Sequence, residues 1–176
     1  SGTNVRFVFT DSTRGWVPVF DDVPNDYGPT YINATGGTVS TSGDYKIHTF
    51  NSSSNFVVSQ ASNQSHTVEY LVVAGGASGG TGCAGGGGGA GGYRTNYPSP
   101  DTGGTTVTAQ TYPVTVGAGG AGVGPGNCVG NPGAASTIFS ITSAGGGGGS
   151  SNNSTNGLSG GSGGGAAHSV SPFGSG

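Results

Sequence analysis

The first 74 residues alternate short apolar runs with turn-forming residues. Two such runs, Val5–Phe9 and Trp16–Phe20, flank the turn-rich connector TDSTRG. Further runs rich in β-forming residues follow at Thr38–Ser40, Asp44–Phe50 and Asn55–Ser59, and Gly and Ser separate them. Short runs bounded by turn residues in this way predict strands. We therefore expect a small antiparallel, β-sandwich-like region near the N-terminus.

Two segments of this region predict how their strands are buried. In Tyr45–Phe50 the odd-numbered positions form an apolar or β-branched face, and Lys46 and His48 occupy the other face, as in a half-buried strand. His66–Gly76 predicts the strongest strand, and its Leu71–Val73 run indicates burial on both faces. No segment has a convincing helical period, so the pattern predicts an all-β chain.

From Gly75 onward the apolar pattern gives way to glycine. In the stretch 75–92 every third residue is glycine, and the other positions hold only Gly, Ala, Ser, Thr and Cys. The residues of this structural glycine frame are Gly76, Gly79, Gly82, Gly85, Gly88 and Gly91. A period of three with glycine is typical of polyproline-II-type helices, which have no internal hydrogen bonds. Such helices need partners outside themselves, so we expect a bundle of polyglycine-II helices bonded side by side.

Two more glycine-rich tracts supply the partners for this bundle. Gly117–Ala134 has a less regular frame, and Ala144–Ala167 has a frame of small residues throughout. The segments between the tracts, Tyr93–Val116 and Ala135–Ser143, indicate strands that pair with the first half or loops at a bundle end. A flexible Gly/Ser linker is the alternative. The expected divisions are a junction segment (1–35), a β region (36–74) and a polyglycine-II domain (75–176).

Charge and composition narrow the function classes. The 176 residues include 41 Gly, 4 basic and 7 acidic residues, for a net charge of −3. Four basic residues offer no patch for nucleic acid. No apolar run approaches the about 18 residues of a membrane span, so we expect no membrane insertion. There is no Met, even at position 1, so we expect a piece of a longer polypeptide or a processed product.

Candidate chemistry is sparse along the chain. Three carboxylates that lie close together in the sequence indicate an acidic turn, and weak Ca²⁺ binding is the alternative. These residues are Asp21, Asp22 and Asp26. The histidines lack metal-ligand spacing; they are His48, His66 and His168. We therefore expect no enzyme activity, no cofactor and no metal. Cys83 and Cys128 are a candidate disulfide, and two small buried thiols are the alternative.

Polar and aromatic residues beside the tracts, or interrupting them, are the candidates for binding. Loops at the end of a rigid scaffold suit recognition, and Tyr and Asn are favoured contact residues. The candidates for receptor contact are Tyr93, Arg94, Asn96, Tyr97, Asn127, Asn131, Asn152 and Asn153. The alternative is that the tyrosines cap the bundle and the asparagines turn the chain.

The order of these motifs resembles a known kind of domain. YLVVAGG, a glycine tract, GGYR, YPVTVGAGG and GGGGG follow one another within residues 36–169. This order resembles the glycine-rich domain of phage tail-fibre and virion-appendage proteins, marine phages in particular. The segment RFVFTDSTRGWVPV is similar to the junction that precedes such domains. The β-rich front half departs from a pure tip adhesin.

The resemblance implies a structural protein of the virion that recognises a host-cell surface glycan or protein. It also implies contacts with other fibre subunits, a homo-oligomer (a trimer by resemblance alone) and an extracellular or virion location. A purely structural filament subunit is the alternative. An ice-binding polyglycine-II protein is a second alternative, which the bulky interruptions and the β half argue against.

Overall fold

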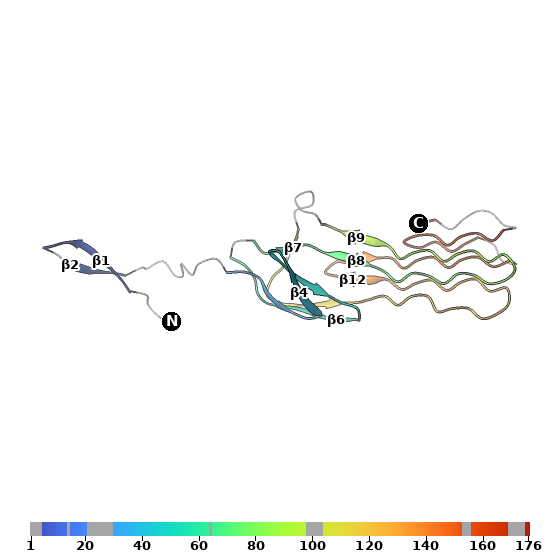
Figure 1. Cartoon of the computed structure of the whole chain (residues 1–176), viewed down its shortest axis with the longest axis horizontal. Helices are drawn as coiled ribbons and strands as arrows, with labels where there is room; N and C mark the ends of the chain where they lie inside the picture. The colour runs from blue at the N-terminus through green and yellow to red at the C-terminus, as the bar shows by residue number, and fades with distance from the viewer. Residues whose placement is uncertain are drawn as a thin grey trace. The chain divides into compact units, whose positions relative to one another are not determined.

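The computed structural model describes residues 5–13, 15–20, 30–63, 65–97, 104–152, 156–168 and 175–176. The chain forms two compact units, Ser1–Thr30 and Tyr31–Gly176 (Figure 1). In the first unit β1 (Val5–Asp11) pairs antiparallel with β2 (Gly15–Phe20), which confirms the two strands predicted there. The rings of Phe9 and Trp16 meet edge to face across this hairpin, 5.6 Å apart.

The second unit contains small antiparallel sheets, and its described residues form no helix. Its strands are β3 (Asn33–Thr35), β4 (Thr38–Ser42), β5 (Tyr45–Thr49), β6 (Ser54–Gln60), β7 (Thr67–Val68), β8 (Leu71–Val73), β9 (Tyr93–Thr95), β10 (Thr105–Thr106), β11 (Thr111–Val114), β12 (Ser136–Ile138) and β13 (Ile141–Ser143). One sheet has the order β11-β6-β3; the pairs β4–β5, β7–β10, β8–β9 and β12–β13 form two-stranded ribbons. We call these strands and the turns between them the β head.

These strands confirm an all-β chain over the described residues, with small sheets in place of the expected sandwich-like region. The predicted runs at 38–40 and 55–59 lie in β4 and β6, and the predicted run at 44–50 contains β5. The segment around TYPV forms β11, which pairs with β6 of the first half; this is the first of the two predicted alternatives for that segment. The unit that begins at Tyr31 contains both the β head and the glycine-rich residues, so no boundary between units falls at residues 74–75.

An aromatic core holds the β head together. Its buried residues are Ala34, Phe56, Val58, Val107 and Val114. The ring of Phe56 lies 5.2 Å from His48 and 6.5 Å from Phe139, in edge-to-face contacts. Phe139 occupies the turn between β12 and β13 with φ of +56°, a conformation that bulky residues rarely adopt. Its ring packs 5.0 Å from Tyr112, so burial in the core offsets the cost of this turn.

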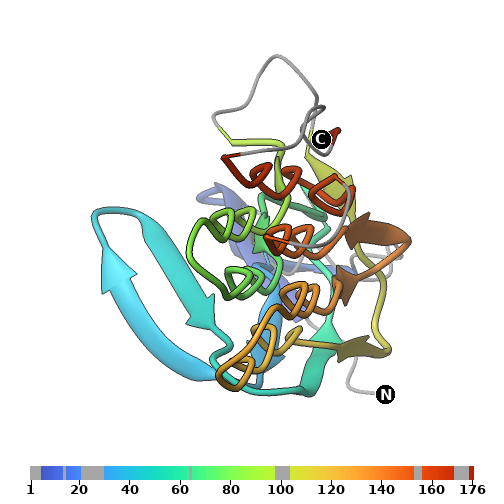
Figure 2. The same cartoon turned by 90° about the vertical axis from the view of Figure 1, so that its right-hand side faces the viewer.

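Three glycine tracts extend from the β head and double back. We call residues 75–92, between β8 and β9, the first tract; residues 117–134, between β11 and β12, the second; and residues 144–167, after β13, the third. Figure 1 shows them running side by side, and Figure 2 shows them end-on as adjacent small coils.

Backbone hydrogen bonds between the tracts recur at every third residue. From the first tract to the second, the amides of Gly75, Ser78 and Thr81 donate to the carbonyls of Ala134, Asn131 and Cys128 at 2.9–3.0 Å. From the first tract to the third, the amides of Gly86, Gly89 and Gly92 donate to Ser150, Gly147 and Ala144 at 2.8 Å. Residues three positions apart thus face the same neighbouring tract, and main-chain groups bond the tracts to one another.

The start of the third tract is the buried centre of this arrangement. Residues 146–151 are buried, and a Cβ added at any position from Gly145 to Gly149 would collide with the main chain of another segment. At Gly148 it would meet the carbonyl of Gly130, and at Gly149 that of Gly86. Only glycine permits backbones to approach this closely.

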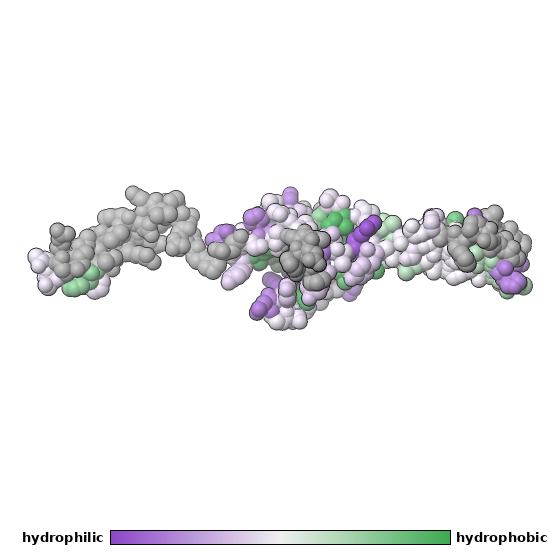
Figure 3. Space-filling view, turned by 90° about the horizontal axis from the view of Figure 1, so that it is seen from above, coloured by the Kyte–Doolittle hydropathy of each residue, from purple (hydrophilic) through white to green (hydrophobic). Residues whose placement is uncertain are grey.

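Two predictions about burial were wrong. Of the Leu71–Val73 run only Val72 is buried, and Leu71 and Val73 are 59% and 54% exposed. The reason is that β8 pairs with β9 alone among the described strands, and only the face that carries Val72 is covered. In β5 the predicted apolar face is not the buried one: Tyr45, Ile47 and Thr49 are exposed, as is Lys46, and only His48 is half-buried, against Phe56. Figure 3 shows exposed apolar side chains gathered on the surface of the β head.

Candidate functional site

The turns of the three tracts meet at the end of the tracts farthest from the β head. The first tract turns at 81–84 and the second at 123–128, and the third reaches the same level at 151–152. We call these residues the distal end. Gly82, with φ of +121°, lies between the other two turns. A Cβ added there would overlap the side-chain oxygen of Asn127 and lie 3.0 Å from the Cβ of Asn152.

Two of the predicted contact residues are therefore neighbours in space, although 25 residues separate 127 from 152 in the sequence. Asn127 is exposed and Asn152 is half-buried. The register of the tracts brings them together, because Thr81 pairs with Cys128 while Gly86 pairs with Ser150. Both amide groups can donate and accept hydrogen bonds.

Thr81 fixes the turn of the second tract against that of the first. Its hydroxyl donates to the carbonyl of Gly124 at 3.2 Å and accepts from the amide of Cys128 at 3.2 Å. Its own amide donates to the carbonyl of Cys128 at 2.9 Å. One side chain thus holds both ends of the second turn. Sequence reasoning missed this residue, although Thr81 is the single threonine in the first tract.

Four of the predicted contact residues lie at the opposite end of the tracts, on or beside β9. Tyr93 and Tyr97 are exposed, and the ring of Tyr97 meets that of Tyr45 edge to face at 6.4 Å. Arg94 is also exposed and pairs in register with Val72. These residues form a surface of the β head, separate from Asn127 and Asn152.

Asn96, the fourth of these, has a structural environment. It is 7% exposed, and its side-chain oxygen accepts a hydrogen bond from the amide of Tyr70 at 2.6 Å. Its Nδ2 donates to the carbonyl of Val68 at 3.3 Å. The amide of Asn96 therefore joins the end of β9 to β7 and to the segment between β7 and β8.

Two predicted contact asparagines remain, Asn131 and Asn153. Asn131 lies inside the second tract, where its Nδ2 donates to the carbonyl of Ala121 at 2.8 Å and so joins the two arms of that tract. Its backbone amide donates to the hydroxyl of Ser78, in the first tract, at 2.8 Å. Asn153 lies outside the described residues.

Glycine is needed at more positions than the predicted frame. At Gly85, Gly88 and Gly91 an added Cβ would collide with the carbonyls of Gly80, Ala77 and Ala74, respectively. At Gly76 the nearest atom would be 3.8 Å away, and at Gly79 3.2 Å, so these two positions are less tight. Collisions also occur outside the frame, at Gly75, Gly80, Gly86 and Gly89. Each half of the first tract packs against several neighbouring segments, so glycine is required in more than one of the three frames.

The cysteines both lie at the distal end. Cys83 is in the turn of the first tract and Cys128 at the end of the second turn. Both are exposed free thiols in the structure, whereas the alternative interpretation placed them in buried positions. The disulfide stays a prediction.

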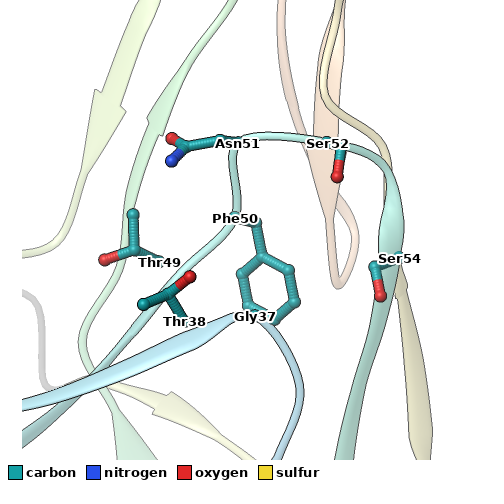
Figure 4. Close-up of a pocket in the computed structure, with 7 residues that line it drawn as sticks. All are labelled: Gly37, Thr38, Thr49, Phe50, Asn51, Ser52 and Ser54. Carbon is teal, nitrogen blue, oxygen red and sulfur yellow. The ribbon is translucent and has the colours of Figure 1, made fainter.

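Other features of the described residues add little chemistry. A shallow depression of about 220 Å³ in the β head is lined by small polar groups and Phe50 (Figure 4); the lining residues are Gly37, Thr38, Thr49, Phe50, Asn51, Ser52 and Ser54. Within the described ranges, no three His, Cys, Asp or Glu side chains come together as a metal site would require. The same ranges hold no helix with the length and apolar character of a membrane span.

Comparison with known proteins supports one part of the resemblance. The sequence pattern of a family described as "Glycine-rich domain" matches residues 49–176. This range contains all three tracts and most of the β head. The search of curated proteins and the search of solved structures each gave no match.

Proposed function

The chain belongs to the glycine-rich domain family, and on that premise we propose that it is the host-recognition domain of a phage tail fibre or virion appendage. In this proposal the protein is not an enzyme. The glycine tracts form a rigid support, and the distal end contacts a glycan or protein on the host surface. The location is the virion or the extracellular space.

The support would be a bundle of polyglycine-II helices. Three observations favour this helix: main-chain bonds that recur every third residue, partners that lie on neighbouring segments, and backbones too close for any Cβ. The buried centre at 146–151 bonds to both other tracts and to the returning part of the third. Many such bonds in parallel would make the support stiff.

The observation that carries the proposal is the meeting of Asn127 and Asn152 beside Gly82. Two amide side chains from different tracts lie at the same end of a hydrogen-bonded scaffold. Residues on loops held by a rigid scaffold bind with a smaller loss of conformational entropy. The described residues of the distal end carry no charged side chain, so this surface suits a partner that forms neutral hydrogen bonds, such as sugar hydroxyls or peptide groups.

A cell-binding assay tests the proposal. The fluorescently labelled protein is mixed with a panel of bacterial strains, and a strain that binds it is used to compare variants. We expect Asn127→Ala combined with Asn152→Ala to weaken binding about tenfold or more, because hydrogen bonds at the contact are lost. Asn51→Ala is the matched control, since Asn51 is an exposed asparagine of the β head. Equal binding by the double variant and the wild type would refute the distal end as the contact surface.

A second candidate function is that of a structural filament or appendage subunit. The observation that favours it is the exposed apolar face of the β8–β9 ribbon, where Leu71, Val73 and Tyr93 lie on one side. Exposed apolar faces often mark contacts between proteins. Leu71→Ser with Val73→Ser should then abolish assembly, measured by sedimentation, without changing cell binding by the monomer. A wild type that stays monomeric at high concentration would exclude this candidate.

A further inference from the structure

The two cysteines of the chain follow two residues that touch each other. Gly82 and Asn127 are in contact at the distal end, and Cys83 and Cys128 are the next residues in the sequence. One position before this contact, the backbone and hydroxyl of Thr81 form three hydrogen bonds to the turn that contains Asn127. The cysteines are therefore held on neighbouring, mutually bonded turns.

We propose that Cys83 and Cys128 form an intramolecular disulfide that ties the turn of the first tract to that of the second. The structure contains the reduced pair, as two exposed thiols. Exposure gives a small-molecule disulfide access to both sulfurs. Thr81, two residues before Cys83, is hydrogen-bonded to Cys128 itself, which places the two cysteine-bearing turns side by side. The bridge would close a loop that includes β9, β10 and β11.

The oxidant is a small-molecule disulfide such as oxidised glutathione. One cysteine thiolate attacks it, forms a mixed disulfide and releases one reduced thiol. The second cysteine thiolate then displaces the other small thiol, which leaves the Cys83–Cys128 bond. The protein loses two protons and two electrons, and the small disulfide is reduced to two thiols.

The bridge is independent of the proposed function. The bridge would form whether or not the distal end binds a host, because only the contact between the two turns is required. It adds a redox state to the distal end: the reduced form holds the turns by hydrogen bonds, and the oxidised form also holds them by a covalent bond.

Mass spectrometry of the full chain in oxidised glutathione tests the bridge. At low protein concentration we expect both free thiols to disappear, the mass to fall by about 2 Da, and digestion to release a peptide pair joined through Cys83 and Cys128. In Cys83→Ser we expect Cys128 to retain one glutathione, because the second thiol is absent. Glutathione retained on both cysteines of the wild type, or bonds between chains only, would overturn the proposal.

A variant of Thr81 tests whether the paired turns bring the cysteines together. Thr81→Val removes the hydroxyl bonds to the second turn, so the equilibrium constant for bridge formation should fall about tenfold in glutathione redox buffers. Thr81→Ser is the matched control, since it keeps the hydroxyl and should bridge as the wild type does. Equal bridging by Thr81→Val would overturn the account of how the cysteines are held.

Discussion

The β head and the glycine tracts belong to one compact unit, yet different groups hold each of them together. In the β head, Phe56 and its aromatic neighbours exclude water around side chains, and each sheet has only two or three strands. In the tracts the buried centre is almost pure backbone, and its hydrogen bonds link segments far apart in the sequence. The head therefore needs large side chains, whereas the tracts need their absence.

This difference bears on function. Side chains that pack the core of the head are not available to a partner. The tracts are bonded through their backbones, so the side chains in their turns are not needed for packing and can contact a partner. Asn96, in the head, has its amide engaged inside the fold, while Asn127 stays exposed at the distal end.

The largest effect is expected at the aromatic core. Phe56→Ala should lower the free energy of unfolding by about 3–5 kcal/mol, because a buried ring that contacts four other rings is removed. Denaturation followed by tyrosine fluorescence measures the change. Tyr45→Ala, which removes an exposed ring, should lower the free energy of unfolding far less. Similar losses for both variants would contradict the assignment of the core.

A single methyl group should have a large effect inside the tracts. Gly148→Ala places a Cβ against the carbonyl of Gly130, and we expect a loss of about 2–3 kcal/mol from overpacking. Gly87→Ala is the matched control: an added Cβ there has no atom within 4 Å, so its stability should stay near that of the wild type. Thermal melts of the two variants compare them directly. If both variants melt alike, the close approach of the backbones is wrong.

Asn96 tests the bonds that join the end of β9 to β7 and to the segment before β8. Asn96→Ala leaves the amide of Tyr70 and the carbonyl of Val68 without their partner, which should cost about 1–3 kcal/mol. Asn51→Ala, at an exposed position, should change stability by less than about 0.5 kcal/mol. Urea denaturation measures both values. An Asn96→Ala protein as stable as Asn51→Ala would show that these buried bonds add nothing.

The smallest expected effect is a gain in stability. The Oγ of Ser150 is buried and has no hydrogen-bond partner among the described residues. Ser150→Ala removes this unpaired hydroxyl and keeps the Cβ that the site already accepts, so we expect stability to rise by about 1 kcal/mol. The expected change in stability thus has the opposite sign to that of Gly148→Ala, two residues away. A lower melting temperature for Ser150→Ala would point to a role for the hydroxyl.

The sequence predicted the strands better than their burial. Runs such as those in β4, β5 and β6 are bounded by Gly and Ser, and local pattern is enough to find them. Which face is buried depends on neighbours that are distant in the sequence. His48 points inward because Phe56 lies there, and Leu71 is exposed because β8 has a single partner strand.

The candidate site was predictable in part for the same reason. Asparagines that interrupt tracts could be recognised as turn residues, and Asn127 and Asn152 are at turns. Their meeting could not be predicted, because it depends on the register between the first tract and the other two. The role of Asn131 inside its tract depends on that tract folding back on itself.

Amide hydrogen exchange tests most directly the claim that the tracts are bonded through their backbones. The amides of Gly86, Gly89 and Gly149 donate to other segments, and we predict that they exchange far more slowly than those of unfolded glycine. Exposed Gly122 and Gly124, near the second turn, should exchange much faster. Exchange of Gly86, Gly89 and Gly149 at the rate of an unfolded chain would contradict the account, because the tracts would then be flexible linkers unable to hold the distal end.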